Sequence, residues 1–294
     1  MKNKYSVCLV TFKEESDLTA SDELFSKCLG KLGIRAEVHP WDNSDVDWQL
    51  FDAVVLRSCW DYHYRPHEFV EWINGLKTKN VNLINTYDLV FWNMHKSYLL
   101  ELERKGISIV PTVYLKMGSN AHPSILNERG WNKIVVKPAI GTSAYEIFSG
   151  WVGDPKVLTK LEQLLLDQDV LVQPLMEEAS QVGEYSSVFF DGSYSHTVLK
   201  KPKEGDFRSN YEQGGTASAV EQDDVTIKEL QKILELLSPT PLYARVDYLM
   251  RDEQPILMEL ELIEPGLYMD LFPPSAESFA NQLRLKLKSS TIAR

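Results

Sequence analysis

Two glutamates separated by one residue lie near the C-terminus, in the segment ILMELELIEPG (residues 256–266). Side chains alternate between the faces of a strand, so Glu259 and Glu261 are predicted to share one face and their apolar neighbours the other. Two like charges at that spacing repel unless water screens them or a cation lies between them. Neighbouring carboxylates suit Mg²⁺, which proteins hold with one or two carboxylates plus substrate phosphates. Taken alone, the segment favours a solvated edge strand, and upstream residues have to decide.

A second segment that could do chemistry, KIVVKPAIGTSAYEIF (residues 133–148), joins a lysine to a loop of small residues. An apolar strand is predicted to deliver Lys137, and residues 141–144 then form a loop before a second strand. Small residues let backbone N–H groups approach an anion, and the lysine adds a charged donor. The order is not that of a P-loop, because a strand and not a helix follows. Such loops are common in plain hairpins, so this segment also depends on its context.

The composition limits the kinds of partner. The chain has 294 residues, 44% hydrophobic and 25% charged, which is ordinary for a globular protein of one large or two to three small domains. A net charge of −11 argues against sequence-independent binding to nucleic acid or anionic membrane. The three cysteines form no CxxC pair, which is typical of a reducing compartment. With neither a signal-peptide pattern nor a run of transmembrane length, we expect a cytoplasmic protein.

The predicted elements change character along the chain. Over the first ninety residues strands and helices alternate, which predicts a small, mostly parallel open sheet. The strands predicted in this part lie at 5–12, 35–41, 51–58 and 81–85, and the helices at 21–33 and 67–79. Later pieces are richer in strands, predicted at 109–116, 133–148, 169–176, 184–201, 242–251 and 255–262, with helices at 94–106, 155–168, 225–237 and from Ser275 onward. We therefore predict an α/β domain over 1–90 and two α+β units of antiparallel character over 91–172 and 173–294.

The order of these motifs resembles the ATP-grasp superfamily of carboxylate–amine ligases, which includes glutathione synthetase and D-alanine–D-alanine ligase. The resemblance covers residues 90–275 and, more loosely, the N-terminal domain. Its strongest elements are Lys137 before a glycine loop, Arg245-Val246-Asp247, and Glu259-x-Glu261 leading to Pro265-Gly266. RSCWDY, NMHKSYLLEL and GDFR look similar to the cyclising ligase subgroup of D-cycloserine biosynthesis. The resemblance implies an N-terminal pre-ATP-grasp substrate domain and two subdomains that clamp ATP.

The resemblance also implies nucleotide-binding residues, which are Lys96, Lys137, Gly141, Gln173, Leu175, Glu184 and Asn210. Lys96, on the predicted helix NMHKSYLLEL, and Lys137 match the two lysines that hold the α- and β-phosphates. Backbone groups of Leu175, in the hinge segment QPLM, would bind the adenine edge. Glu184 matches the acid that accepts both ribose hydroxyls. On spacing alone, Lys96 is equally well explained as an exposed helix lysine, and Glu184 better as a turn residue.

Metal and catalytic residues follow from the same comparison. Asp247, Glu259 and Glu261 match the metal ligands, which implies two Mg²⁺ ions shared with the triphosphate and Mn²⁺ as a substitute. The family usually has Asn where Glu261 stands, so this ligand departs from the pattern. Arg245, two residues before Asp247 and therefore on the same strand face, would face the acyl phosphate and the tetrahedral intermediate. Gly266 would offer a backbone N–H to the same oxyanion.

A charged loop, LKKPKEGDFRSNYEQGG (residues 199–215), has two interpretations. Its composition is that of a solvated loop. In the family it would be a lid that brings the positive charges of Lys200 and Arg208 to the γ-phosphate, with Asn210 as a further lid residue.

The N-terminal domain is expected to hold the substrate. In VVLRSCWDYHYRPHEF (residues 54–69), polar and aromatic residues follow directly on a parallel-type strand, where ligands of open α/β sheets bind. Arg57 would pair with a carboxylate and Asp61 with an ammonium group, beside Trp60. An aromatic core cluster with a surface ion pair is an equally good interpretation. His63 and His67 have the spacing of a zinc helix, but the intervening proline argues against one.

The expected function is an ATP-dependent ligase that converts the carboxylate of a small amino-acid-like substrate into an acyl phosphate, releases ADP and forms an amide. The nitrogen nucleophile would come from a second substrate or from the same molecule, and catalysis would rest on positioning and charge. One alternative is a non-catalytic nucleotide-binding module of the same fold. Another is a glycosidase, although Glu259 and Glu261, about 7 Å apart on one strand face, would not flank a bond from opposite sides. A homodimer is left open.

Overall fold

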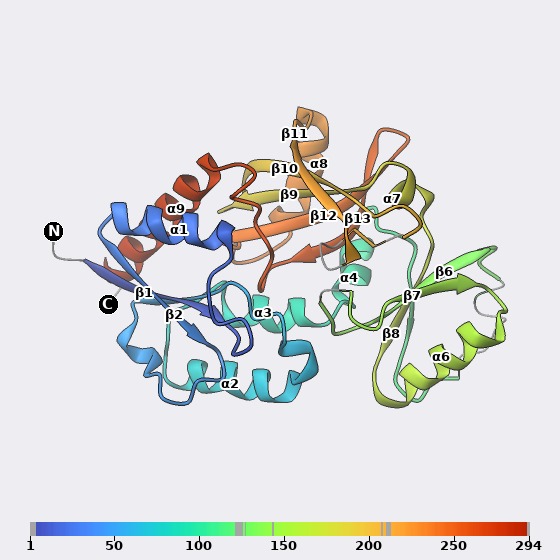
Figure 1. The fold of residues 1–294 in the computed structure, drawn as a ribbon, viewed down its shortest axis with the longest axis horizontal. Helices are drawn as coiled ribbons and strands as arrows, with labels where there is room; N and C mark the ends of the chain where they lie inside the picture. Colours follow the sequence, from blue (N-terminus) through green and yellow to red (C-terminus); the bar gives the residue numbers. More distant parts are fainter. Residues whose placement is uncertain are drawn as a thin grey trace.

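The computed structural model describes residues 4–120, 126, 128–142, 144–206, 208–209 and 213–292, without the side chains of 290–292. Within these ranges the strands form three sheets. Figure 1 shows the N-terminal sheet on the left and the sheet that includes residues 133–174 on the right. None of the helices in these ranges is both long and apolar enough to cross a membrane.

The N-terminal sheet is parallel, with strand order β2-β1-β3-β4. Its strands are β1 (Tyr5–Thr11), β2 (Ile34–Pro40), β3 (Ala53–Leu56) and β4 (Leu83–Ile84). Around it lie α1 (Ala20–Lys31), η1 (Trp48–Leu50), η2 (Tyr62–Tyr64), α2 (Pro66–Thr78) and α3 (Tyr87–Met94). The central strands β1 and β3 are apolar on both faces because α1 packs on one face and α2 on the other. The predicted open α/β architecture is confirmed.

The second sheet is antiparallel, with strand order β5-β8-β6-β7. Its strands are β5 (Val113–Leu115), β6 (Lys133–Pro138), β7 (Phe148–Trp151) and β8 (Val170–Pro174). Helix α6 (Pro155–Asp167) buries Leu161 and Leu164 against the apolar side chains of β6 and β8. Asp154 caps this helix by accepting a hydrogen bond from the Lys156 N–H.

The third sheet is also antiparallel, with strand order β11-β10-β9-β12-β13. Its strands are β9 (Glu184–Phe190), β10 (Ser193–Lys201), β11 (Thr216–Val220), β12 (Tyr243–Arg251) and β13 (Gln254–Glu261), and α7 (Glu177–Gln181) precedes it. Helix α8 (Asp224–Glu235) covers one face. The C-terminal helix α9 (Pro274–Ile292) returns to α1, where Phe25 and Phe279 stack with ring centroids 4.1 Å apart. One core therefore joins the N-terminal sheet to the third sheet.

The helix predicted over 94–106 is wrong in its first turn. Helix α3 ends at Met94 and α4 spans Tyr98–Arg104, so Lys96 lies in the turn between them rather than on a helix. The Lys96 N–H donates to the Ala139 carbonyl at 2.7 Å, a tertiary bond that replaces a bond within a helix. This bond ties the turn to the loop after β6.

Candidate active site

Charged side chains share one face of the third sheet. Asp247 pairs in register with Ser186 on one side and Glu259 on the other, and Arg245 pairs with Glu261. Because residues two apart on a strand point the same way, these side chains project together from the face opposite α8. The shared face predicted for Glu259 and Glu261 is confirmed.

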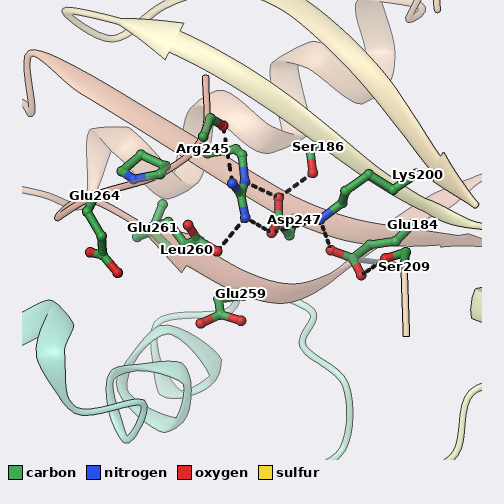
Figure 2. A network of polar contacts seen from close by, with 12 residues as sticks. Glu184, Ser186, Lys200, Ser209, Arg245, Asp247, Glu259, Leu260, Glu261 and Glu264 are labelled. Atoms are coloured by element: carbon green, nitrogen blue, oxygen red, sulfur yellow. Dashed lines mark hydrogen bonds and ion pairs between the residues drawn. The ribbon is translucent and has the colours of Figure 1, made fainter. Parts of the chain in front are cut away.

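Arg245 is the centre of this network, which Figure 2 shows. Its guanidinium forms a two-pronged ion pair with Asp247, at 2.9 Å from Nε to Oδ1 and 2.8 Å from Nη2 to Oδ2. Nη2 also pairs with Glu261, and Nη1 donates to the Gly266 carbonyl at 3.1 Å. Burial favours the neutral form of Asp247, but Arg245 and Lys200 outweigh it and hold the pKa of this carboxyl well below its usual range. The charges are therefore fixed before any ligand arrives.

Lys200 connects this network to a second carboxylate. Its ammonium group lies 3.2 Å from Asp247 Oδ2 and pairs with Glu184, directly opposite it on β9. The other oxygen of Glu184 accepts a hydrogen bond from Ser209 at 3.1 Å. Burial nevertheless raises the pKa of Glu184. This carboxylate is held at two oxygens, so an incoming ligand would have to compete for them.

Two lysines approach the same cavity from outside the third sheet. Lys96 forms an ion pair with Glu259. Its ammonium group thus neutralises a carboxylate that a bound metal ion would otherwise neutralise. Lys137, on β6, is only 6% exposed, and in the described part of the chain its ammonium group has no hydrogen-bond or ion-pair partner. Burial lowers its pKa to about 8 despite the attraction of Glu259. A buried cation without a partner is typical of a site for an anion.

The cavity between the second and third sheets has a volume of about 150 Å³. Its apolar lining residues include Val135 and three that pack in one cluster, Val110, Met176 and Met258. Its charged lining residues are Lys96, Lys137, Glu184, Lys200, Arg208, Arg245, Asp247, Glu259 and Glu261. An apolar cluster and charged groups in one cavity match a ligand that carries both a flat base and phosphates.

A second cavity, of about 260 Å³, adjoins the first and shares part of its wall. The residues common to both are Thr142, Lys200, Ser209, Arg245 and Glu261. The second cavity alone is lined by Thr19, Ala20, Ser21, Trp60, Ala217, Gly266, Tyr268 and Asp270. It therefore lies between the start of α1 and the turn after β13. Two ligands placed in the two cavities would meet at Arg245.

The structure brings most of the predicted nucleotide residues to the first cavity. Gly141, Gln173 and Leu175 line it together with the charged residues named above. The Leu175 N–H donates to the Lys133 carbonyl at 2.9 Å, so this group is already used, and the Gln173 side chain donates to Thr112 Oγ1. Arg208 lines the cavity while paired with Asp206. Asn210 lies outside the described residues.

The N-terminal prediction needs correction for two of its three residues. Arg57 is 1% exposed, and its Nε donates to Asp22 Oδ1 at 2.7 Å. Asp61 accepts from Trp41 Nε1 at 2.7 Å and pairs with Arg65. Neither Arg57 nor Asp61 lines either of these two cavities. Both charges are neutralised within the fold, so a substrate carboxylate or ammonium would find no free partner there. Trp60 does reach the second cavity.

Sequence reasoning missed several lining residues. Tyr268 lies 5.7 Å from the Arg245 guanidinium, measured to the ring centroid, and has a positive φ of 50°. Thr19 and Asp270 also line the second cavity. Thr142, which belongs to the loop of small residues already predicted to approach an anion, lines both cavities. For Tyr268, the signal in the sequence was its place two residues after Pro265-Gly266. Tertiary proximity, not spacing, brings α1 to this site.

Across the residues that the structure describes, no group of three His, Cys, Asp or Glu side chains is arranged to hold a metal ion. In the same part of the chain, ion pairs with Lys96, Lys200 and Arg245 neutralise the three predicted carboxylate ligands. Burial raises the pKa of Glu261 to about 7, and Asp247 and Glu259 add to the effect while Arg245 opposes it. Burial therefore makes Glu261 the one of these three carboxyls that is easiest to protonate near neutral pH.

Comparison with known proteins decides the family. A family model described as the N-terminal domain of D-cycloserine synthetase DcsG matches residues 7–85. The cycloserine biosynthesis protein DcsG of Streptomyces lavendulae is 30% identical over 275 residues, which cover 87% of this chain and 90% of that protein. The chain belongs to the DcsG family of ATP-grasp ligases.

Solved structures agree with this assignment. The crystal structure of D-cycloserine synthetase DcsG matches with a TM-score of 0.86 and 27% identity, covering 96% of this chain and 99% of that one. D-Alanine–D-alanine ligase from Bacillus anthracis, complexed with ATP, has a TM-score of 0.67 at 16% identity over 98% of both chains, which shows a shared fold. The predicted ATP-grasp fold is confirmed. The chain is an ATP-dependent ligase that forms amide bonds. The comparisons therefore favour the ligase over the two alternatives, a non-catalytic nucleotide-binding module and a glycosidase.

Proposed function

We propose that this ligase activates the carboxylate of a small amino-acid-like substrate as an acyl phosphate, releases ADP and phosphate, and joins the acyl group to a nitrogen nucleophile. The observation that carries the proposal is the shared wall of the two cavities, where Arg245, Lys200 and Glu261 lie. ATP in the first cavity and a carboxylate in the second would place the γ-phosphate and the attacking oxygen at this wall. Holding two reactants in this way is a large part of catalysis.

The lining residues support a division of tasks within the first cavity. The base would lie against the apolar cluster near Leu175, and Glu184 would exchange its partners for the ribose hydroxyls. Lys137 would bind the phosphates, since its buried ammonium group has no partner in the described part of the chain. Lys96 would do the same after releasing Glu259. Gly141 fits beside the phosphates because, among the described residues, Pro138 at 3.8 Å is the one neighbour near the position that a side chain would take there.

Three of the carboxylates that line the cavity fit Mg²⁺ by their chemistry. We propose that Asp247, Glu259 and Glu261 hold two Mg²⁺ ions, for which Mn²⁺ would substitute, once Lys96 and Lys200 turn to the phosphates. Among the described residues, five cations and four carboxylates line this cavity. A triphosphate carries about four negative charges, so its arrival would turn this near balance into an excess of negative charge, which Mg²⁺ would neutralise while polarising the γ-phosphate.

At the reacting centre, Arg245 would stabilise the charge that develops on the acyl phosphate and on the tetrahedral intermediate. Its guanidinium is already fixed by Asp247, so little reorganisation is needed when the charge forms. The backbone N–H of Gly266, in the turn whose carbonyl Arg245 holds, would donate to the same oxyanion. Lys200 and the lid residues Arg208 and Asn210 would add positive charge near the γ-phosphate.

The substrate would lie in the second cavity, next to Trp60 and Asp270. Asp270 is exposed and would pair with an ammonium group. Because the DcsG relative is a D-cycloserine synthetase, we include ring closure within one amino-acid-like molecule among the reactions that this enzyme performs. An amino acid with a nitrogen nucleophile in its side chain would supply both reacting groups.

The test is a phosphate-release screen with Mg-ATP and panels of D- and L-amino acids, including members whose side chains carry a nitrogen nucleophile. We expect ADP and phosphate in equal amounts, together with an amide product found by mass spectrometry. Glu259→Gln is the matched control, since it keeps the shape of the side chain and removes its charge. Release of AMP, or turnover that is identical in the control, would contradict the proposal.

Three further parts of the proposal concern organisation. We propose domain boundaries at 90 and 172, supported by the separate sheets of residues 5–84, 113–174 and 184–261, although β8 runs two residues past the second boundary and α9 packs on the first unit. A cytoplasmic location is supported by three free, buried cysteines. We also propose that the enzyme acts without nucleic acid or membrane, supported by its net charge of −11. Light scattering would decide between monomer and homodimer.

A further inference from the structure

The turn that follows β13, residues 264–267, is held in place through its carbonyl groups. Each of its four consecutive carbonyl oxygens accepts a hydrogen bond from a side chain that lies far away in the sequence. The pairs are Glu264 with Trp60 Nε1 (3.0 Å), Pro265 with Arg57 Nη2 (2.8 Å), Gly266 with Arg245 Nη1 (3.1 Å) and Leu267 with His196 Nε2 (3.0 Å). These side chains come from the loop after β3, from β12 and from β10, so the turn is fixed from three directions.

Two of the four donors, Arg57 and His196, have no place in either cavity. Arg57 is 1% exposed, and Asp22 at the start of α1 holds its Nε at 2.7 Å, so the second arm of the fork is directed at the turn. His196 is 4% exposed and stacks on Phe272 with ring centroids 5.2 Å apart. Both are buried polar side chains, and binding of a nucleotide in the first cavity would not require either of them.

His196 acts as a neutral donor. Burial lowers its pKa to about 4, so the ring carries no charge near neutral pH. Ser195 Oγ lies 3.0 Å from Nδ1 and can donate to it, which leaves the proton on Nε2 for the Leu267 carbonyl. The ring is thus held in one tautomer by the residue before it.

The amide side of the same turn is free. Within the described ranges, the N–H groups of residues 266–268 have no hydrogen-bond partner. Gly266 and Tyr268 line the second cavity, and the next N–H, of Met269, donates to Ser21 Oγ at 2.9 Å in α1. Bonded carbonyls and free N–H groups in one turn give it the polarity that an anion requires. A rotated peptide would instead present a carbonyl oxygen, which repels an anion.

We propose that Arg57 and His196 are positioning residues that hold the carbonyls of this turn and thereby keep its N–H groups directed at the reacting carboxylate. The inference rests on the proposed function. It gives Arg57 a role that differs from the substrate contact predicted from the sequence. The N-terminal domain then contributes to the chemistry through the turn as well as through the substrate cavity.

Paired variants of His196 provide the test. His196→Phe keeps the ring on Phe272 and loses the donor, whereas His196→Gln keeps an N–H near the position of Nε2. We expect the ligation kcat to fall about tenfold or more in the Phe variant, the scale of a small misplacement at a reacting centre, and to recover in the Gln variant. The KM for ATP is expected to stay within about twofold in both variants. Arg57→Lys keeps the charge opposite Asp22, loses the bond to Pro265 and is expected to behave like His196→Phe.

Two outcomes would overturn the inference. Equal kcat values in wild type and His196→Phe would show that the bond to Leu267 does not affect the chemistry. Equal losses of kcat in the Phe and Gln variants, accompanied by an equally lowered melting temperature, would show a purely structural role. Crystal structures of wild type and His196→Phe separate this inference from the proposed function, because an unmoved turn refutes positioning even if no ligation substrate has been found. Absence of ligation in wild type, with the turn displaced in the variant, would contradict the proposed function alone.

Discussion

Removing the buried cation Lys137 is expected to stabilise the ligand-free enzyme while it abolishes nucleotide binding. Burial lowers the pKa of Lys137 from 10.5 to about 8. Each unit of pKa corresponds to about 1.4 kcal/mol, so keeping this side chain charged costs the folded state about 3 kcal/mol near pH 7. In Lys137→Met the unbranched methionine side chain still fills the space of the lysine side chain, but Glu259 loses its electrostatic attraction to the ammonium group. We therefore expect the free energy of unfolding to rise by about 1–2 kcal/mol at pH 7.

The gain should depend on pH in a defined direction. Between pH 8 and 10.5 the unfolded chain keeps a proton on Lys137 that the folded protein has released. The unfolded state binds more protons in this window, so the free energy of unfolding of the wild type rises with pH there. The Lys137→Met variant lacks this contribution. Its advantage is expected to be full below pH 8 and to shrink as the pH approaches 10.5.

Urea unfolding at pH 7 and pH 9.5 measures the effect, with Lys133→Met as the matched control. Lys133 lies on the same strand with an exposed side chain, so its replacement should change stability little at either pH. Mg-ATP is expected to raise the melting temperature of wild type and of the control, but not of Lys137→Met. A variant that is less stable than wild type at pH 7, or that keeps the full ATP shift, would refute the reasoning.

Other positions give further expectations. Glu259→Gln should abolish turnover and raise the Mg²⁺ concentration required, whereas Glu261→Asn, which introduces the residue usual in the family, should retain most activity. Steady-state kinetics at varied Mg²⁺ measure both effects, and full activity in both variants would exclude a metal-binding role for these two glutamates. Arg245→Met should lower saturated turnover by about a hundredfold or more with ATP affinity within a few-fold, and Lys96→Ala should weaken ATP binding first, which calorimetry and kinetics on both variants will separate. Burial, with repulsion from Glu261, raises the pKa of Glu264 to about 8. Between pH 4.5 and 8 the folded protein therefore binds more protons than the unfolded chain, so the free energy of unfolding of the wild type should fall as pH rises through this range. Glu264→Gln lacks this group and should not show that fall. A parallel pH dependence in both proteins would contradict that assignment.

The charged face of the third sheet was predictable in part from the sequence because strand alternation is local. The period of two placed Glu259 with Glu261 and Arg245 with Asp247, each pair on one face of its own strand. The family resemblance, and not the alternation, brought the two pairs to one site, because their common face depends on the register of β12 with β13. Their partners were less accessible, since Lys96 reaches Glu259 only through the turn that the Ala139 carbonyl holds. A helical pattern over 94–106 hides that turn, because the bond that breaks the helix is tertiary.

The N-terminal residues show a different limit. Arg57 and Asp61 follow a parallel strand, where ligands commonly bind, but both charges find partners inside the protein. Asp22 lies on α1 and could be linked to Arg57 only once the helix was placed on the sheet. Burial of a charge depends on such long-range neighbours, which no spacing in the sequence encodes. The same holds for His196, whose partner Leu267 is 71 residues away.

The acyl phosphate is the central claim, and oxygen transfer tests it most directly. Once the screen has supplied a substrate, its carboxylate is labelled with ¹⁸O, and the phosphate released with Mg-ATP is analysed by mass spectrometry. If the carboxylate attacks the γ-phosphate at the wall shared by the two cavities, one labelled oxygen per turnover appears in the phosphate, and the nucleotide product is ADP. Unlabelled phosphate formed along with the amide, or label in AMP, would contradict the account.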